Sequence, residues 1–327
     1  MTSPRRQLVD PAAPGYFHCM TRCVRRAFLC GVDAGGGDSF EHRRAWIEER
    51  ILELGSVFAV AVYAYAVMSN HVHVVLHVDP EAAARWSADE VARRWATLFP
   101  VRLPDGSVDQ LATRNRAEAT AGNPERVSTC RARLASLSWF MRCLNEPIAR
   151  RANREDKCTG RFWEGRFKCQ AMLDDAALLA CMSYVDLNPV RSKMAEGLSD
   201  SAHTSAKRRI EASTGDAALP LSPVSASIST PTLSLSEVDY LDLVDWTGRQ
   251  VRTDKRGVIT SSVPSVLRRI GVDAGSWRYQ VLGIESRYWR AVGTADALMQ
   301  KAAELGQYWL KGCGARCARR AAAAAFG

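Results

Sequence analysis

Two apolar runs rich in β-branched residues, separated by only two residues, constrain the fold more than any other part of this sequence. The runs are 57–68 (VFAVAVYAYAVM) and 71–78 (HVHVVLHV), and the residues between them, Ser69-Asn70, are typical of turns. Such a pair predicts an antiparallel hairpin, because a short turn joins strands that run in opposite directions. A shorter alternating stretch, 16–22 (YFHCMTR), predicts a further strand.

Four segments predict helices from apolar residues at helical spacing or from helix-starting residues. They are expected over about 40–54, 81–97, 131–152, and from Asp174-Asp175 to about Asn188. Ser39 is expected to cap the first helix, Pro147 to interrupt or kink the third, and Pro189 to stop the fourth.

The segments between the helices predict a loop, a strand and a turn. Residues 100–128 are polar, with Pro, Gly and Asn, and are expected to form a loop or insertion. Residues 161–173 (RFWEGRFKCQAML) suggest a strand, and Gly31 with Gly35–Gly37 a turn region.

Composition shifts along the chain predict three parts. Residues 1–200 are expected to form the main domain. Residues 201–236 are expected to be a flexible linker, since 212–236 are rich in Ser, Thr, Pro and Ala without periodicity. Residues 237–327 are expected to form a small α-rich module of unknown role, ending in a frayed basic tail.

The charge balance favours a polyanionic partner. Lys plus Arg outnumber Asp plus Glu by 44 to 35, which gives a net charge of +9 and suggests nucleic acid before membrane. No stretch approaches the roughly 20 apolar residues of a membrane span, and the N-terminus lacks the apolar core of a signal peptide. We therefore expect a soluble, cytoplasmic protein.

The ten cysteines are not expected to form a disulfide framework, which belongs to short secreted chains. Two pairs share a C-x3-C spacing, Cys19/Cys23 and Cys313/Cys317, but neither has an obvious complement for a zinc site. Reduced, mostly buried thiols are expected instead.

His71 and His73 are the first candidate site. Alternation along a strand places both imidazoles on one face, with Val72 and Val74 pointing into the core. Two such imidazoles can share a divalent ion, but they can equally be unrelated surface histidines on a half-buried sheet. His77 has the same parity but lies about 13 Å along the strand from His73, so a structural role is expected for it.

Tyr184 and Asn188 are the second candidate site. They are four residues apart on the expected late helix and therefore project from one face. A phenol there can be a nucleophile and an amide oxygen one turn later can be a metal ligand. A core-facing tyrosine followed by a helix-terminal asparagine is the alternative.

In combination these features resemble the single-tyrosine HUH transposases, in particular the REP-associated branch. The similar stretches are PGYFHCMTR, AYAVMSNHVHVVL, GRFWEGRFK and YVDLNPVR, which occur in that family's order over roughly residues 14–195. The resemblance implies an α+β, ferredoxin-like antiparallel sheet with helices on one face. It further implies His71 and His73 as ligands of Mg²⁺ or Mn²⁺, Tyr184 as nucleophile, and Asn188, the polar residue one turn after the tyrosine, as a third ligand.

A basic segment suits single-stranded or hairpin DNA, the partner that the resemblance implies. Residues 131–170 carry a net charge of +6, with aromatic residues interleaved for base stacking. We expect DNA contacts from Arg161, Arg166 and Lys168. Arg191 is expected either to contact phosphate or to cap its helix.

The function that the resemblance implies is a DNA transposase, an endonuclease that cleaves and rejoins one strand through a 5′-phosphotyrosine. A domesticated, non-catalytic DNA-binding regulator of repeated palindromes is the main alternative. A replication-initiator or relaxase type of nuclease ranks lower, because no Gly-rich phosphate-binding loop with Lys-Ser/Thr is present. A metallohydrolase would need further ligands near the hairpin. Association with the nucleoid and a homodimer are compatible with the main interpretation.

Overall fold

The structure is a computed structural model that describes most of the chain. The described residues are 8–24, 30, 39–213, 220–231, 233, 235–251, 265–284 and 290–311. The turn region expected at Gly31 and Gly35–Gly37, the pair Cys313/Cys317 and the expected basic tail lie outside them. Within them, no helix combines the length and apolar character that crossing a bilayer requires.

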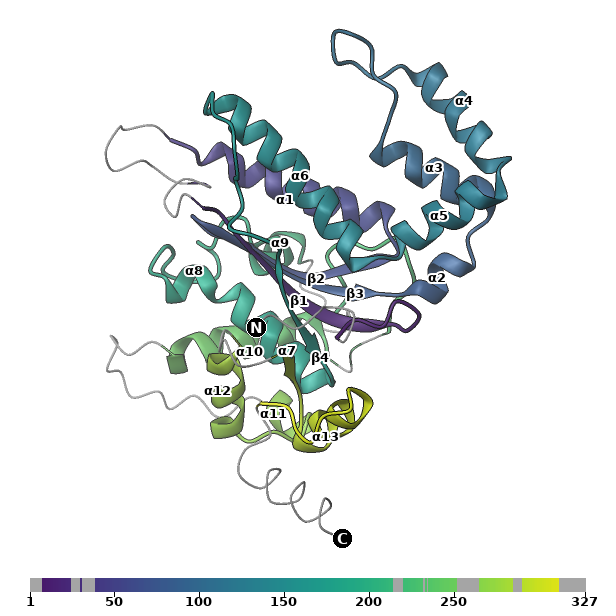
Figure 1. Cartoon of the computed structure of the whole chain (residues 1–327). Coiled ribbons are helices and arrows are strands. Elements are labelled where there is room, and N and C mark those ends of the chain that lie inside the picture. The colour runs from purple at the N-terminus through teal and green to yellow at the C-terminus, as the bar shows by residue number, and fades with distance from the viewer. Residues whose placement is uncertain are drawn as a thin grey trace.

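A five-stranded sheet forms the centre of the molecule, in the order β2-β3-β1-β4-β5 (Figure 1). The predicted hairpin is confirmed, since β2 and β3 pair antiparallel across Ser69-Asn70, and so is the strand predicted at 16–22. The segment 161–173 forms a strand only in its second half. The strands are β1 (Gly15–Arg22), β2 (Val60–Val67), β3 (His71–Val78), β4 (Lys168–Met172) and β5 (Ala291–Val292).

The connections between the first four strands confirm the α+β class. A helix joins β1 to β2, and β3 returns between them, so that β3 pairs antiparallel with both neighbours. β4 is antiparallel to β1 on its other side, which gives the ferredoxin-like arrangement. Only β5 runs parallel to its neighbour, β4.

One face of the sheet is covered by α1 (His42–Val57) and α6 (Leu137–Glu155), as Figure 1 shows. Ile47, Ile51 and Leu54 of α1 are buried there. Two details differ from the sequence-based expectation. Glu41, not Ser39, precedes α1, and no side chain caps it. Pro147 lies inside α6 without ending it.

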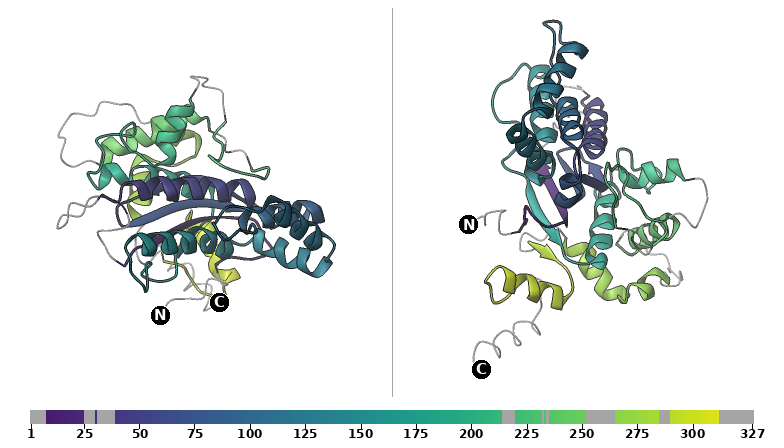
Figure 2. Two further views of the ribbon diagram at one scale, coloured as in Figure 1. Left: turned by 90° about the horizontal axis from the view of Figure 1, so that it is seen from above. Right: turned by 90° about the vertical axis from the view of Figure 1, so that its right-hand side faces the viewer.

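The opposite face is also covered by helices, so the expectation of helices on one face only is wrong. α7 (Asp175–Asp186) packs on it, and every residue from Ala176 to Asp186 is buried. All eight residues of β2 are buried as well, as a strand covered on both faces requires. Further helices follow α7 in the chain, as the right-hand view of Figure 2 shows. They are α8 (Asn188–Arg191), α9 (Ser205–Ala212), α10 (Glu237–Val251), α11 (Ser265–Arg269), α12 (Ala274–Gly283) and α13 (Ala295–Glu304). α8, α10 and α12 contact α7, whereas the buried residues of α13 belong to the core on the face of α1 and α6.

The expected flexible linker, 201–236, is packed structure in its described parts. It contains α9, and its later part pairs with β2. The amide of Val62 donates to the Ser225 carbonyl, and the amide of Val224 donates to the Val62 carbonyl, each at 2.8 Å. The approach is close, since a Cβ added at Gly55 of α1 would lie 2.6 Å from the Ser225 hydroxyl. Its serines hydrogen-bond to backbone groups, and this explains how a low-complexity composition becomes ordered. The division into three domains remains a prediction.

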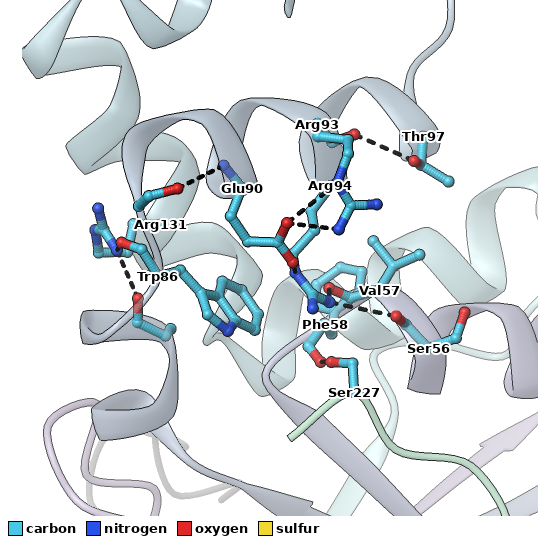
Figure 3. A network of polar contacts seen from close by, with 12 residues as sticks. Ser56, Val57, Phe58, Trp86, Glu90, Arg93, Arg94, Thr97, Arg131 and Ser227 are labelled. Atoms are coloured by element: carbon cyan, nitrogen blue, oxygen red, sulfur yellow. Dashed lines mark hydrogen bonds and ion pairs between the residues drawn. The ribbon is translucent and has the colours of Figure 1, made fainter. Parts of the chain in front are cut away.

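Residues 100–128, expected to form a loop or insertion, are part of a helical insertion, although residues 100–109 carry no helix. The insertion between β3 and α6 consists of α2 (Pro80–Ala84), α3 (Ala88–Leu98), α4 (Gln110–Ala121) and α5 (Pro124–Leu134). Arg94 attaches it to α1 by donating to the carbonyl of Val57 at 2.9 Å (Figure 3). Arg131 connects α5 to the start of the insertion by donating to the carbonyls of Ala83 and Trp86 at 2.6 Å each. The helices within it were not expected, because α4 is largely exposed and therefore polar.

Asp186, at the end of α7, ties that helix to the C-terminal part of the chain. One carboxylate oxygen accepts from the Ser205 hydroxyl and from the amide of Ala206, and the other accepts from the Tyr240 hydroxyl at 2.6 Å. The carboxylate is fully buried, and desolvation raises its pKa against the opposing effect of these hydrogen bonds.

Replacing Tyr240 by Phe is expected to lower the free energy of unfolding by about 1–3 kcal/mol, because a buried carboxylate oxygen loses its donor. Chemical denaturation measures this change. Tyr308→Phe is the matched control, since Tyr308 is 76 % exposed, and it should change stability by less than about 0.5 kcal/mol. Equal stability of the two variants would contradict a structural tie between α7 and α10.

Candidate functional site

His71 and His73 lie together on the face of the sheet that α7 covers. Their ring centroids are 4.7 Å apart with an angle of 83° between the planes, while Val72 and Val74 belong to the core on the opposite face. The predicted alternation is therefore confirmed. His73 is fully buried, which excludes the interpretation of this residue as a surface histidine.

Both imidazoles are held through Nδ1. Nδ1 of His71 hydrogen-bonds to the Asn70 side-chain oxygen, and Nδ1 of His73 lies 2.9 Å from Nε2 of His18 on β1. His18 in turn bonds through Nδ1 to the Gln170 side-chain oxygen of β4, at 2.8 Å. Histidine ligands of metals are commonly held in this way by their second nitrogen. The nitrogens that could meet a metal ion are therefore the two Nε2 atoms.

The helix α7 brings Tyr184 to the same place. The Tyr184 ring centroid lies 5.8 Å from that of His73 and 6.3 Å from that of His18, both edge to face. The tyrosine is only 1 % exposed, and the Arg191 guanidinium lies over its ring at 4.5 Å. Residues more than 100 positions apart in the sequence thus form one cluster, in which His18, His73 and Tyr184 are buried and His71 is partly exposed.

Asn188 follows on α8 rather than on α7. Pro189, expected to stop the helix, lies instead within the first turn of α8, where its missing N–H costs no hydrogen bond. Asn188 is 8 % exposed, and its buried side-chain nitrogen has no hydrogen-bond partner. That nitrogen is a hydrogen-bond donor and cannot bind a metal, so a metal would have to meet the amide oxygen of Asn188.

The donor set fits a divalent ion that accepts both imidazole and oxygen. No group of three His, Cys, Asp or Glu side chains that could hold a metal occurs among the described residues. A metal here would therefore depend on the imidazoles of His71 and His73 and the amide of Asn188. Mn²⁺ accepts nitrogen more readily than Mg²⁺ does. The described cysteines form no disulfide.

The surroundings of His73 keep its imidazole neutral. Burial lowers its pKa well below the ordinary value, and the charges of His18, His71, Arg22 and Arg191 act in the same direction. A neutral imidazole is the form that coordinates a metal. The two arginines also make the site electropositive, as an anionic substrate requires.

The segment that carries Arg161 and Arg166 docks at the His71 end of the sheet. The amide of Glu164 donates to the Arg22 carbonyl at 2.9 Å, and Arg22 lies opposite His71 in the β1–β3 pairing. Arg161, Arg166 and Lys168, at the start of β4, are all exposed. These predicted DNA-binding side chains are therefore exposed on the side of β1 that faces away from β3, the strand of His71 and His73.

Three residues of the site were not singled out from the sequence. His18, Arg22 and Gln170 join it through strand pairing, His18 to Gln170 and Arg22 to His71. His18 and Arg22 stood in the stretch PGYFHCMTR and Gln170 in the strand expected at 161–173, but nothing in their spacing points to His73.

Comparisons with protein-family profiles and with curated proteins find no match. Among solved structures, the chain is similar to a REP-associated tyrosine transposase bound to a REP hairpin, with a TM-score of 0.34 and 13 % sequence identity. The alignment covers 72 % of this chain and 98 % of that one. At a TM-score and an identity this low, we infer neither the fold nor the function of this chain from its neighbour.

His77 lies away from the histidine pair and against Tyr16, with ring centroids 4.5 Å apart and the ring planes tilted by 38°, and is 3 % exposed. Burial lowers its pKa. The unfolded chain therefore binds a proton near pH 6.5 while the folded chain resists it, so stability falls as the pH drops below that value.

His77→Phe is expected to remove this contribution. Between pH 6.5 and the lowered pKa, the free energy of unfolding of the variant should fall less steeply, by up to about 1.4 kcal/mol per pH unit. Denaturation series at several pH values measure the slope. Parallel slopes for the two proteins would show that His77 titrates alike in both states.

Proposed function

We propose that this chain is a metal-dependent DNA strand-transferase that cleaves and rejoins single-stranded, hairpin-containing DNA through a 5′-phosphotyrosine. The observation that carries the proposal is the placement of the Tyr184 ring 5.8 Å from His73, whose ring lies 4.7 Å from that of His71. A nucleophile beside a pair of potential metal ligands is the arrangement that phosphodiester attack requires.

In the proposed step, the phenol oxygen of Tyr184 bonds to phosphorus as its proton leaves. The bond from phosphorus to the 3′ oxygen breaks, and that oxygen takes up a proton to become a hydroxyl. One phosphodiester is exchanged for another, so a second 3′ hydroxyl can reverse the step without an external source of energy. A single tyrosine therefore suffices for both cleavage and joining.

His71, His73 and Asn188 are the residues that would hold the metal. When bound, a divalent ion orients a nonbridging phosphate oxygen and offsets the charge that develops during attack. Arg22 and Arg191 add positive charge around the same position, as their effect on the pKa of His73 indicates.

The burial of Tyr184 favours a flexible substrate. The Arg191 guanidinium lies over the Tyr184 ring, so a phosphate can reach the phenol only if this side chain moves. A guanidinium binds phosphate strongly, so an incoming phosphate can draw Arg191 away from the ring. A flexible single strand can bring a phosphate to a buried phenol more easily than a stiff duplex can. The exposed Arg161, Arg166 and Lys168 would contact the DNA backbone.

The buried position of α7 also favours action by one chain. The helix is covered throughout by its own chain and fixed by Asp186, so exchanging it between subunits would expose a large apolar surface. A homodimer is therefore not required to complete the site.

The alternative, a DNA-binding regulator without catalysis, predicts hairpin binding with no covalent product. The proposal predicts a covalent adduct with Mn²⁺ or Mg²⁺ that Tyr184→Phe abolishes, because phenylalanine lacks the nucleophile, while hairpin affinity changes little. Denaturing gel electrophoresis of labelled hairpin DNA detects the adduct, and Tyr308→Phe should leave its yield unchanged. An undiminished adduct in Tyr184→Phe would remove Tyr184 as the nucleophile.

Replacing Arg161 and Arg166 together by Ala is expected to weaken DNA binding and to flatten its salt dependence. Losing two phosphate contacts should reduce the slope of log affinity against log salt by about 1.4 for a single strand. Fluorescence anisotropy over a range of salt concentrations measures the slope. The charge-matched control replaces Arg114 and Arg116, exposed on α4 away from the site, and an equal effect there would contradict a local DNA contact.

A further inference from the structure

A continuous line of hydrogen bonds runs from the C-terminal part of the chain to His73. The Gln170 amide nitrogen donates to the backbone carbonyl of Ile284 at 2.7 Å. The Gln170 side-chain oxygen lies 2.8 Å from Nδ1 of His18, and Nε2 of His18 lies 2.9 Å from Nδ1 of His73. His18 and His73 are buried, so these bonds are shielded from exchange with water.

Each bond in this line has a direction that follows from the one before it. A backbone carbonyl can only accept, so the nitrogen of the Gln170 amide faces Ile284 and its oxygen faces His18. That oxygen can only accept, so Nδ1 of His18 carries a proton, and His18 in its neutral form presents the lone pair of Nε2. This lone pair accepts from His73, which must therefore carry its own proton on Nδ1.

We infer that Gln170 and His18 are positioning residues that hold the His73 imidazole with its proton on Nδ1, so that Nε2 is the nitrogen presented to a divalent ion. The inference rests on the proposed function in taking that ion to be the ligand. The Ile284 carbonyl, at the C-terminal end of α12, orients the Gln170 side chain and through it the hydrogen bonds of His18 and His73.

The line matters because an imidazole has two tautomers, and only one of them leaves Nε2 able to coordinate. Without an acceptor at Nδ1, the His73 ring would lose both its preferred tautomer and its orientation. Losing a partner of this kind typically weakens metal affinity about 10–100-fold. His71 depends on a different and local partner, Asn70, so the effect is specific to His73.

The direct test is the tautomer of His73 in the metal-free protein. Long-range ¹H–¹⁵N correlation spectra of histidine-labelled protein distinguish a proton on Nδ1 from one on Nε2. The inference predicts that the His73 proton is on Nδ1 in the full-length wild-type chain. A proton on Nε2 alone would overturn it, because Nδ1 of His73 could then only accept and His18 would have to donate. A proton on both nitrogens would also overturn it, because Nε2 would then have no lone pair for a divalent ion.

A matched pair of substitutions tests the same point through metal binding. Gln170→Met and Gln170→Glu both lose the bond to Ile284, but only Glu keeps an acceptor for His18. Mn²⁺ affinity, measured by electron paramagnetic resonance without DNA, is expected to fall about 10-fold or more in Gln170→Met and to stay near the wild-type value in Gln170→Glu. Equal affinities for the two variants would contradict the inference.

His18 offers a second pair. His18→Phe keeps the ring shape without an acceptor and should weaken Mn²⁺ binding about 10–100-fold, whereas His18→Gln retains an acceptor and should recover most of the affinity. His77→Phe, a buried histidine substitution on the same strand as His73, should leave affinity unchanged. Unaltered affinity in His18→Phe would overturn the inference.

These measurements separate the inference from the proposed function. If the wild-type chain forms the Tyr184 adduct but His73 carries its proton on Nε2, the positioning role is wrong and the function stands. If the tautomer and Mn²⁺ results agree with the inference but no hairpin and no metal gives an adduct, the positioning role stands and strand transfer is wrong.

Discussion

The packing of α7 against the histidine face of the sheet is the contact on which the rest of the site depends. It brings Tyr184, from late in the chain, within 5.8 Å of His73, from the first hairpin. Neither residue alone differs from an ordinary core residue, and both are almost completely buried. Only their juxtaposition, with His71 beside them, gives the cluster a chemistry that a hydrophobic core does not have.

The C-terminal part of the chain holds this contact in place. The Asp186 carboxylate connects the end of α7 to α9 and α10, and the Ile284 carbonyl reaches the histidines through Gln170. β5 extends the sheet beside β4, the strand that carries Gln170. Residues expected to form a separate module are therefore part of the support of the candidate site. This arrangement accounts for a large second core that shares residues of α7, α10 and α12.

Local patterns in the sequence were enough to predict the hairpin, the first strand and the shared face of His71 and His73, because β-branched residues and period-two alternation act over a few neighbours. The second layer of helices was missed, although the uninterrupted apolar run of β2 is the mark of a strand buried on both faces. α4 was missed because few of its residues are buried, which leaves no apolar stripe. His18 and Gln170 could not be found, since their partners lie 55 and 114 residues away along the chain.

The central claim is that the phenol of Tyr184 attacks DNA at a centre formed with the histidine pair. Mapping the DNA-linked residue by mass spectrometry tests it most directly, after incubation with a hairpin substrate and Mn²⁺ followed by nuclease and trypsin digestion. Trypsin releases residues 169–191 as one peptide, in which Tyr184 is the only tyrosine. The account predicts a nucleotide phosphate on that peptide, at Tyr184. A covalent nucleotide on any other residue, or hairpin cleavage with no residue modified, would contradict it.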